Sequence, residues 1–195
     1  MIPATTIVTE PTAEPLTLTE VKDSLRDTPV EDDALVSVLI TAARRAAEAH
    51  THRVFVTQTW DYFADKFPAS AITFLELPRP PLVSVTSIKY TDTDGVQQTW
   101  DSSKYVVDTH AERGRILPAW SEIWPSTRQV MNAVEIRFVA GYGVPDDVPE
   151  DIRTAMLLQI NHLYDHRQSV VIGAIGTVLP LGVKALLSPY ISKRF

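Results

Sequence analysis

The sequence predicts an α+β fold in which a mostly antiparallel β domain is inserted into a helical core. Three observations favour this prediction. Apolar residues recur at helical spacing over residues 16–53, alternate with polar residues over 54–145, and return to helical spacing over 146–169. We therefore expect about three main helices and a short C-terminal helix in the core, with the β domain between the second and third main helices.

The size and composition of the chain fit an ordinary folded protein. Its 195 residues can bury a core without disulfides or metal ions, and the sequence contains no cysteine. No apolar run approaches the roughly 18 residues that a membrane-spanning helix needs, so we expect no membrane partner. The first ten residues lack the basic and apolar regions of a secretory signal, and we expect the protein to stay in the compartment that makes it.

The net charge of -6 is concentrated near the N-terminus. Residues 1–50 contain four Lys or Arg against nine Asp or Glu, whereas the rest of the chain is nearly balanced. No basic cluster accumulates along the sequence, which argues against tight binding to a nucleic-acid backbone. A nucleic acid that meets this protein should therefore pass without sequence-specific binding.

Residues 1–15 are rich in Thr, Pro and Glu and poor in large apolar side chains. We expect them to form a flexible arm, or a strand that orders on a neighbour. The first two helices should lie in residues 16–53. Thr17 and Glu20 have the spacing of a capping box, which predicts a short helix that ends near Arg26.

The second predicted helix begins at Glu31 or Asp32, either of which can cap it, and ends near His50. Its apolar stripe is rich in alanine, which permits close approach of another helix. Ordinary core packing is the favoured interpretation of this stripe, and a contact between subunits is the alternative. The stripe contains Leu35, Val38, Leu39, Ala42, Ala43 and Ala46.

The region 54–145 contains many β-branched and aromatic residues in alternation, which favours strands. Residues 92–95 read Asp-Thr-Asp-Gly and predict a tight hairpin turn. Residues 77–81 should be extended and should cross the sheet or form an edge, because Pro80 and Pro81 lack amide donors. The predicted strands are residues 54–63, 72–77, 84–90, 96–100, 105–108, 114–117 and 133–139.

Two tryptophans lie close together in an irregular segment of the β domain. Trp120 and Trp124 are favoured as cover for the sheet core, since large aromatic side chains dominate most cores. The alternative is an exposed anchor for a partner protein, a position in which Trp is enriched.

Helical spacing returns after Pro149, which suits the first turn of a helix because its missing amide would have no partner there. This helix, within residues 146–169, should end near Arg167. Residues 170–178 are small and apolar with two glycines, and an amphipathic stretch follows them. We interpret residues 170–195 as a flexible arm that carries a docking helix.

The search for catalytic chemistry gives one weak candidate. His162 and His166 lie four residues apart on a predicted helix, with Asp165 nearby, and this spacing can place two imidazoles on one metal ion. No third ligand is identifiable, and the sequence has neither a Gly-x-Ser-x-Gly elbow nor a phosphate-binding loop. We predict no catalytic residue, no metal site and no cofactor, and keep a metal-dependent hydrolase as a minor alternative.

Several short motifs, each weak alone, occur in a specific order. They are Glu14-Pro15-Leu16-Thr17, Asp32-Asp33-Ala34-Leu35, Thr57-Gln58-Thr59-Trp60, Glu76-Leu77-Pro78-Arg79-Pro80-Pro81-Leu82, Tyr105-Val106-Val107-Asp108, Val139-Ala140-Gly141-Tyr142-Gly143, and Val148-Pro149-Glu150 with Tyr164 and Arg167. In this order the chain resembles the head-tail connector (adaptor, or head completion) proteins of tailed bacteriophages, in the version with a β insertion.

The resemblance implies a structural protein of the virion neck that is made in the host cytoplasm and is not an enzyme. Such proteins form a ring, typically of twelve copies, between the portal protein and the tail, where the ring extends the DNA channel and docks a tail-completion or stopper protein. On this basis we expect Leu186, Leu187 and Tyr190 to bury against the portal, and Asp32 and Asp33 to face the channel. Another neck or tail assembly component is the alternative.

Overall fold

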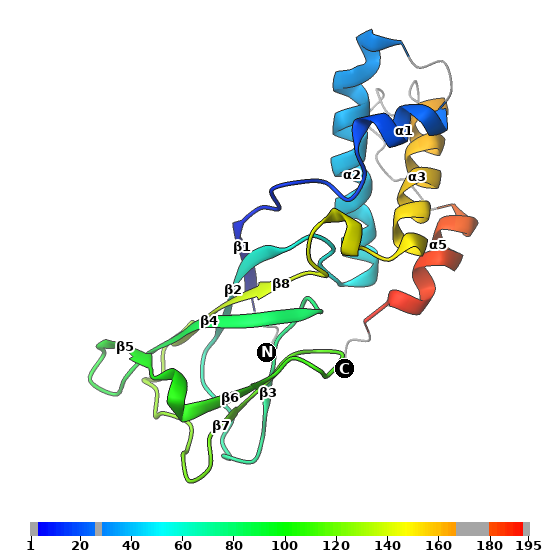
Figure 1. The fold of residues 1–195 in the computed structure, drawn as a ribbon. Helices are drawn as coiled ribbons and strands as arrows, with labels where there is room; N and C mark the ends of the chain where they lie inside the picture. The colour runs from blue at the N-terminus through cyan, green and yellow to red at the C-terminus, as the bar shows by residue number, and fades with distance from the viewer. Residues whose placement is uncertain (1–3, 26–28, 167–179, 193–195) are drawn as a thin grey trace. The chain divides into compact units, whose positions relative to one another are not determined.

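The computed structural model describes residues 4–25, 29–166 and 180–192 (Figure 1). The chain divides into two compact units. One, which we call the β unit, contains Met1–Pro11 and Thr57–Tyr142. The other, the helical unit, contains Thr12–Val56 and Gly143–Phe195. The α+β fold class with a β insertion is thereby confirmed. No helix in the described ranges is long and apolar enough to span a membrane.

The helical unit is built from four described α-helices, α1 (Leu18–Leu25), α2 (Asp33–Thr51), α3 (Glu150–Asp165) and α5 (Leu181–Leu187). The first helix contacts both α2 and α3, and α5 packs mainly on α3. Figure 1 shows α2 and α3 side by side and running in opposite directions. Their shared core is aliphatic and includes Val21, Val36, Ile40, Ala43, Ala47, Ile152, Met156, Ile160, Val183 and Leu187.

The capping box predicted for α1 is confirmed. The Thr17 amide donates to Glu20 Oε2 over 2.7 Å, and the Glu20 amide donates to Thr17 Oγ1 over 3.2 Å. Arg153 of α3 also pairs with the Glu20 carboxylate. The box therefore fixes the start of α1 and at the same time connects this helix to α3.

The predicted cap of α2 is wrong. Asp32 occupies the N-cap position but its side chain makes no capping hydrogen bond. A 3-10 turn, Val30–Asp32, leads directly into the helix, and the Asp33 amide donates to the Val30 carbonyl oxygen. The Asp33 amide is thus satisfied by the backbone of the turn and needs no side-chain cap. The Asp32 side chain instead accepts a hydrogen bond from Tyr164.

The predicted apolar stripe of α2 is correct only in part. Leu39 and Ala43 are buried, but Leu35, Val38 and Ala42 are exposed. The predicted residues spread over more than one side of the helix, so they could not all face one core. The buried side is instead formed by Val36, Leu39, Ile40, Ala43 and Ala47.

The β unit contains one five-stranded and one three-stranded antiparallel sheet. In spatial order the larger sheet comprises β1 (Ala4–Thr9), β2 (Gln58–Ala64), β8 (Val134–Ala140), β4 (Leu82–Thr91) and β5 (Gln97–Trp100). The smaller sheet comprises β3 (Leu75–Glu76), β7 (Arg115–Pro118) and β6 (Tyr105–Asp108).

Two boundaries of the β region differ from the prediction. Ala4–Thr9, expected as a flexible arm or as a strand that orders on a neighbour, is an edge strand that pairs with β2 of its own chain, with Ile7 opposite Trp60. Residues 54–56, expected in the first strand, are buried in the helical unit, where the Phe55 amide donates to Glu48 Oε1 over 2.9 Å. In both places a partner distant in sequence decides the outcome.

The turns of the β unit follow the local sequence more closely. At the predicted hairpin, Gly95 has a φ of 89°, and the Asp92 carboxylate accepts the amides of Asp94 and Val96. The Pro-rich segment was predicted to be extended, but Arg79 has a φ of 66° and the Pro80-Pro81 bond is cis, so the chain turns before β4. Residues 77–81 form no strand themselves, as their missing amide donors predicted, and β4, which follows them, lies between β8 and β5.

The two tryptophans have opposite environments. Trp124 stacks on Phe67, with ring centroids 5.1 Å apart, and lies 5.3 Å from Trp100 in a buried aromatic cluster. Trp120, four residues earlier, is 97% exposed. The favoured interpretation, cover for the core, therefore holds for Trp124. Trp120 is exposed, and its role as an anchor for a partner stays a prediction.

Candidate interaction surfaces

The outer face of the smaller sheet carries a cluster of exposed apolar side chains. Val106 of β6 and Leu117 of β7 are cross-strand partners and are both exposed there. Ile72, Phe74 and Trp120 are exposed on the adjoining segments, and all five line one hollow of about 680 Å³. We call these five residues the β-face patch. Exposed apolar clusters of this kind mark contacts with other macromolecules.

A paired charge borders the β-face patch. Arg115 lies over the Phe74 ring, 5.2 Å from its centroid, and its Nη2 is 2.5 Å from Asp108 Oδ2 on the neighbouring strand. The hydrogen bonds from Arg115 and from the His110 amide hold the pKa of the Asp108 carboxyl below its ordinary value. An apolar centre with a polar rim is the usual composition of a protein interface.

A second exposed surface runs along α2. Leu35, Val38, Ala42, Arg45 and Ala49 are exposed and follow one another at alternating steps of three and four residues. We call this row the α2 seam. Such spacing keeps side chains in line along one side of a helix, and that side is the one opposite the buried residues.

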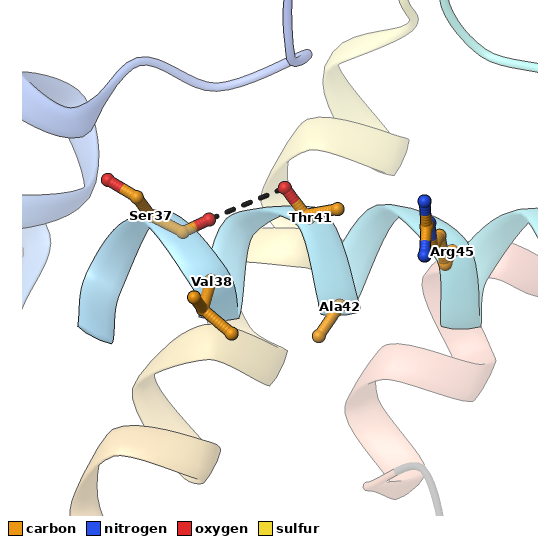
Figure 2. A pocket seen from close by; sticks show the side chains of 5 residues that line it. All are labelled: Ser37, Val38, Thr41, Ala42 and Arg45. Carbon is orange, nitrogen blue, oxygen red and sulfur yellow. Dashed lines mark hydrogen bonds between the residues drawn. The ribbon is translucent and has the colours of Figure 1, made fainter. Parts of the chain in front are cut away.

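Figure 2 shows the middle of the α2 seam, where a shallow hollow of about 510 Å³ is lined by Ser37, Val38, Thr41, Ala42 and Arg45. Val38 and Ala42 project from successive turns on the same side (Figure 2). The Thr41 hydroxyl donates to Glu14 Oε1 over 2.9 Å and lies 3.4 Å from the Ser37 carbonyl oxygen, so this polar group is already satisfied within the helical unit. The hollow is therefore mainly apolar, with one cation at its end.

The residues predicted to dock on a portal lie in and after α5, which is packed on its own helical unit. Leu187 is fully buried there, so its side chain serves the core and is not free to contact a partner. Leu186 and Tyr190 are partly exposed. The Tyr190 hydroxyl donates to Asp151 over 3.3 Å and its carbonyl oxygen accepts from Arg53 Nε over 2.6 Å. Residues 167–179, which the sequence assigned partly to a flexible arm, lie outside the described residues.

The two acidic residues predicted to face a channel each have a partner in the helical unit. Tyr164 donates its hydroxyl to the Asp32 carboxylate, and Lys22 Nζ lies 2.5 Å from Asp33 Oδ1. These contacts join the start of α2 to the end of α3 and to α1. Whether Asp32 and Asp33 also border a channel stays a prediction.

The histidine pair does not form a metal centre in the described residues. The rings of His162 and His166 lie 4.5 Å apart, and His166 Nδ1 is 2.9 Å from the carbonyl oxygen of His162. Within the described ranges no group of three or more His, Asp or Glu side chains could hold a metal ion. Among the residues that the structure describes, none is brought to this pair as a third ligand.

Sequence reasoning found only part of these surfaces. It singled out Trp120 as one of two alternatives, but assigned Ile72 and Phe74 to an ordinary strand. It also placed Val38 and Ala42 in a core-facing stripe. The spacing of the α2 seam can be recognised in the sequence. The same helix carries a second apolar row, however, and the sequence does not indicate which of the two rows is buried.

A helical unit with an antiparallel β insertion is also the fold of chains in the neck of a gene transfer agent particle. Three solved structures share it across nearly the whole chain. No protein-family model matches the sequence, and no curated protein does.

The matched structures are particles of a gene transfer agent (GTA). A chain in the neck of an empty GTA particle, computed with C6 symmetry, has 24% identity and a TM-score of 0.79 over 98% of this chain and 97% of that one. A chain of the native GTA virion has 24% identity and a TM-score of 0.77 over 98% and 96%. A chain in the native neck, computed with C12 symmetry, has 23% identity and a TM-score of 0.75 over 100% and 97%. At these identities the likeness shows the fold.

Proposed function

We propose that this protein is a structural subunit of a virion neck, and that its copies form a ring between the portal and the tail of a phage-like particle. The observation that carries the proposal is the match to a neck chain with a TM-score of 0.79 over 98% of this sequence. The match extends through both the helical unit and the β insertion, so it is not limited to a common helical motif.

Ring formation is supported by the symmetry of the matched assemblies and by the surfaces of this chain. The matched necks were computed with C6 and C12 symmetry. A closed ring requires each copy to offer two different surfaces, one to each neighbour. The β-face patch and the α2 seam are two exposed surfaces with apolar residues, and either could contact a neighbouring copy.

The charge of the chain fits a channel for DNA. A net charge of -6 repels the phosphate backbone, which prevents the passing genome from binding to the wall. Asp32 and Asp33 are the residues we propose for the channel side. This role is structural: the protein acts in the neck after assembly in the host cytoplasm, and catalyses nothing there.

The partners we propose are the portal protein on one side and a tail-completion or stopper protein on the other. Leu186 and Tyr190 remain the candidates for portal contact because both are partly exposed at the end of the helical unit. The variant Leu186→Ser with Tyr190→Ser tests this contact while Leu187 stays in the core. Weaker binding to the cognate portal is expected, and unchanged binding would exclude the contact. Leu181→Ser, at a residue 85% exposed in the same helix, is the matched control.

Negative-stain electron microscopy of the protein, alone and mixed with the cognate portal assembly, tests the function itself. We expect rings stacked on the axis of the portal. Failure to bind a well-formed portal would overturn the portal-tail position and favour another neck or tail component, which is the alternative function.

A further inference from the structure

The helical unit has exposed rows on both of its long helices. The buried sides of α2 and α3 face their shared core, so their outer sides point away from each other. The outer side of α2 is the α2 seam. The outer side of α3 carries four exposed residues, Asp151, Thr154, Leu158 and Asp165. With Asn161 they follow steps of three and four residues. Asn161 is half-buried and donates to Ser24 of α1, and Asp151 accepts from the Tyr190 hydroxyl, so these two residues border the row where it meets its own unit. We call this second row the α3 seam.

The two seams differ in charge. Arg45 is the charged residue of the α2 seam, and the α3 seam carries the carboxylates of Asp151 and Asp165. Each seam also has an exposed aliphatic side chain near its middle, Val38 at 65% exposure and Leu158 at 44%. Two rows of this kind can pack as a helix pair, with apolar side chains interlocked and opposite charges adjacent.

The levels of these residues along the helices also agree. Tyr164 of α3 donates to Asp32 at the start of α2, so these two residues lie at one level of an antiparallel pair. Both helices rise by about 1.5 Å per residue. Val38 lies six residues after Asp32, and Leu158 lies six residues before Tyr164, so these two residues are level. Arg45 and Asp151 each lie thirteen residues from the same contact and are level for the same reason.

We propose that the α2 seam of one copy packs against the α3 seam of the next copy, and that this contact closes the ring. It rests on the ring function proposed above. In a ring whose axis runs along the helices, rotation keeps levels unchanged, so Val38 meets Leu158 of the next copy and Arg45 meets its Asp151. The surfaces lie on opposite flanks of the unit, as a head-to-tail contact requires.

Variants that block one seam at a time test this contact. Val38→Asp places a carboxylate on the α2 seam and leaves the α3 seam intact, whereas Leu158→Asp does the reverse. We expect each variant alone to associate at least about tenfold more weakly than wild type and to form no rings. Mixed in equal amounts, the two variants should form a one-to-one dimer that cannot grow. Both residues are exposed, so thermal melting should show folded proteins.

A charge exchange tests the level of contact. Arg45→Asp and Asp151→Arg should each reduce ring formation, and the double variant should restore it, because every interface then regains one pair of opposite charges. The chain has no cysteine, so Val38→Cys with Leu158→Cys adds the only thiols. A short bismaleimide should join these copies into a ladder of covalent multimers, while either single cysteine variant should stop at dimers or below.

The possible outcomes distinguish a failure of the contact between the two seams from a failure of the proposed ring function. Rings that persist in Val38→Asp and Leu158→Asp, alone and on the cognate portal, would overturn the contact and leave the ring function standing. Loss of rings in Ile72→Asp, at an 87% exposed residue of the β-face patch, with rings retained in Val38→Asp, would assign the contact to the β unit instead. Wild-type protein that stays monomeric with and without portal would overturn both.

Discussion

Arg44 in the middle of α2 donates from Nε to Glu14 Oε2 over 2.7 Å and so fastens the segment before α1 to the second helix. Arg44 is only 2% exposed, and its Nη1 also donates to Glu48 Oε2 over 3.0 Å. Burial by itself lowers the pKa of the guanidinium, but the hydrogen bonds and charges of Glu14 and Glu48 outweigh it and hold the pKa above its ordinary value. This cation therefore holds two carboxylates within the helical unit.

Arg44→Ala should destabilise the protein strongly. The substitution leaves the largely buried carboxylate of Glu48 without its cation, and the loss of one partner of a buried ion pair costs about 3 kcal/mol. Urea denaturation followed by circular dichroism measures the change. Arg45→Ala removes the same side chain from the next position and should change the free energy of unfolding of the unassembled protein less than Arg44→Ala does, because the Arg45 side chain is exposed. Equal effects of the two substitutions would contradict the assignment.

The capping box of α1 should make stability depend on acid. Hydrogen bonds from the Thr17 amide and hydroxyl, with a smaller contribution from Arg153, lower the pKa of Glu20 below its ordinary value of 4.5. A depressed pKa in the folded state stabilises the protein above pH 4.5, and this stabilisation is lost as the pH falls through the folded-state pKa. Glu20→Gln should therefore flatten the acid side of a plot of melting temperature against pH. Glu31→Gln, an exposed change of the same charge, should leave that slope closer to wild type.

Trp120 and Trp124 should respond to alanine in opposite ways. Trp124→Ala opens a cavity beside Phe67 and should cost about 3–5 kcal/mol of stability. Trp120→Ala removes an exposed ring and should leave the melting temperature near that of wild type, while binding to a neck partner becomes weaker. Calorimetry gives the first quantity, and co-sedimentation with assembled portal and tail-completion protein gives the second. Unchanged co-sedimentation of Trp120→Ala would remove the β-face patch from the binding surface.

Gly114 should not tolerate a side chain. A Cβ there would lie 2.1 Å from Leu82 Cδ2 and 2.5 Å from Leu82 Cβ, so Leu82 or the backbone must move. Gly114→Ala should therefore cost about 1–3 kcal/mol, the usual cost of overpacking. In α5, a Cβ on Gly182 would meet nothing within 4 Å, and Gly182→Ala should stabilise the helix by up to about 1 kcal/mol. Thermal melting of both variants checks the contrast, which an equal loss of stability would refute.

The elements predicted well are those whose contacts are local. Thr17 and Glu20 are three residues apart, and Asp92 and Gly95 close a single turn, so the sequence contains both partners of each contact. The start of α3 after Pro149 follows for the same reason. The elements predicted poorly depend on distant partners. Ala4–Thr9 forms a strand because β2 offers a free edge, and Leu187 is buried because α5 folds back on α3.

The sequence by itself determined the order of helical and β segments after the first edge strand, the acidic N-terminal region and the absence of thiol chemistry, since these depend on residue type and local spacing. Only the tertiary structure decided which of two apolar rows on α2 is buried, which tryptophan is exposed, and that Leu187 belongs to the core. Burial is a property of the whole packed chain. The sequence does not distinguish an apolar residue that packs inside its own unit from one that packs on a neighbouring copy. The surfaces proposed for assembly could therefore be distinguished from the core only after the core was known.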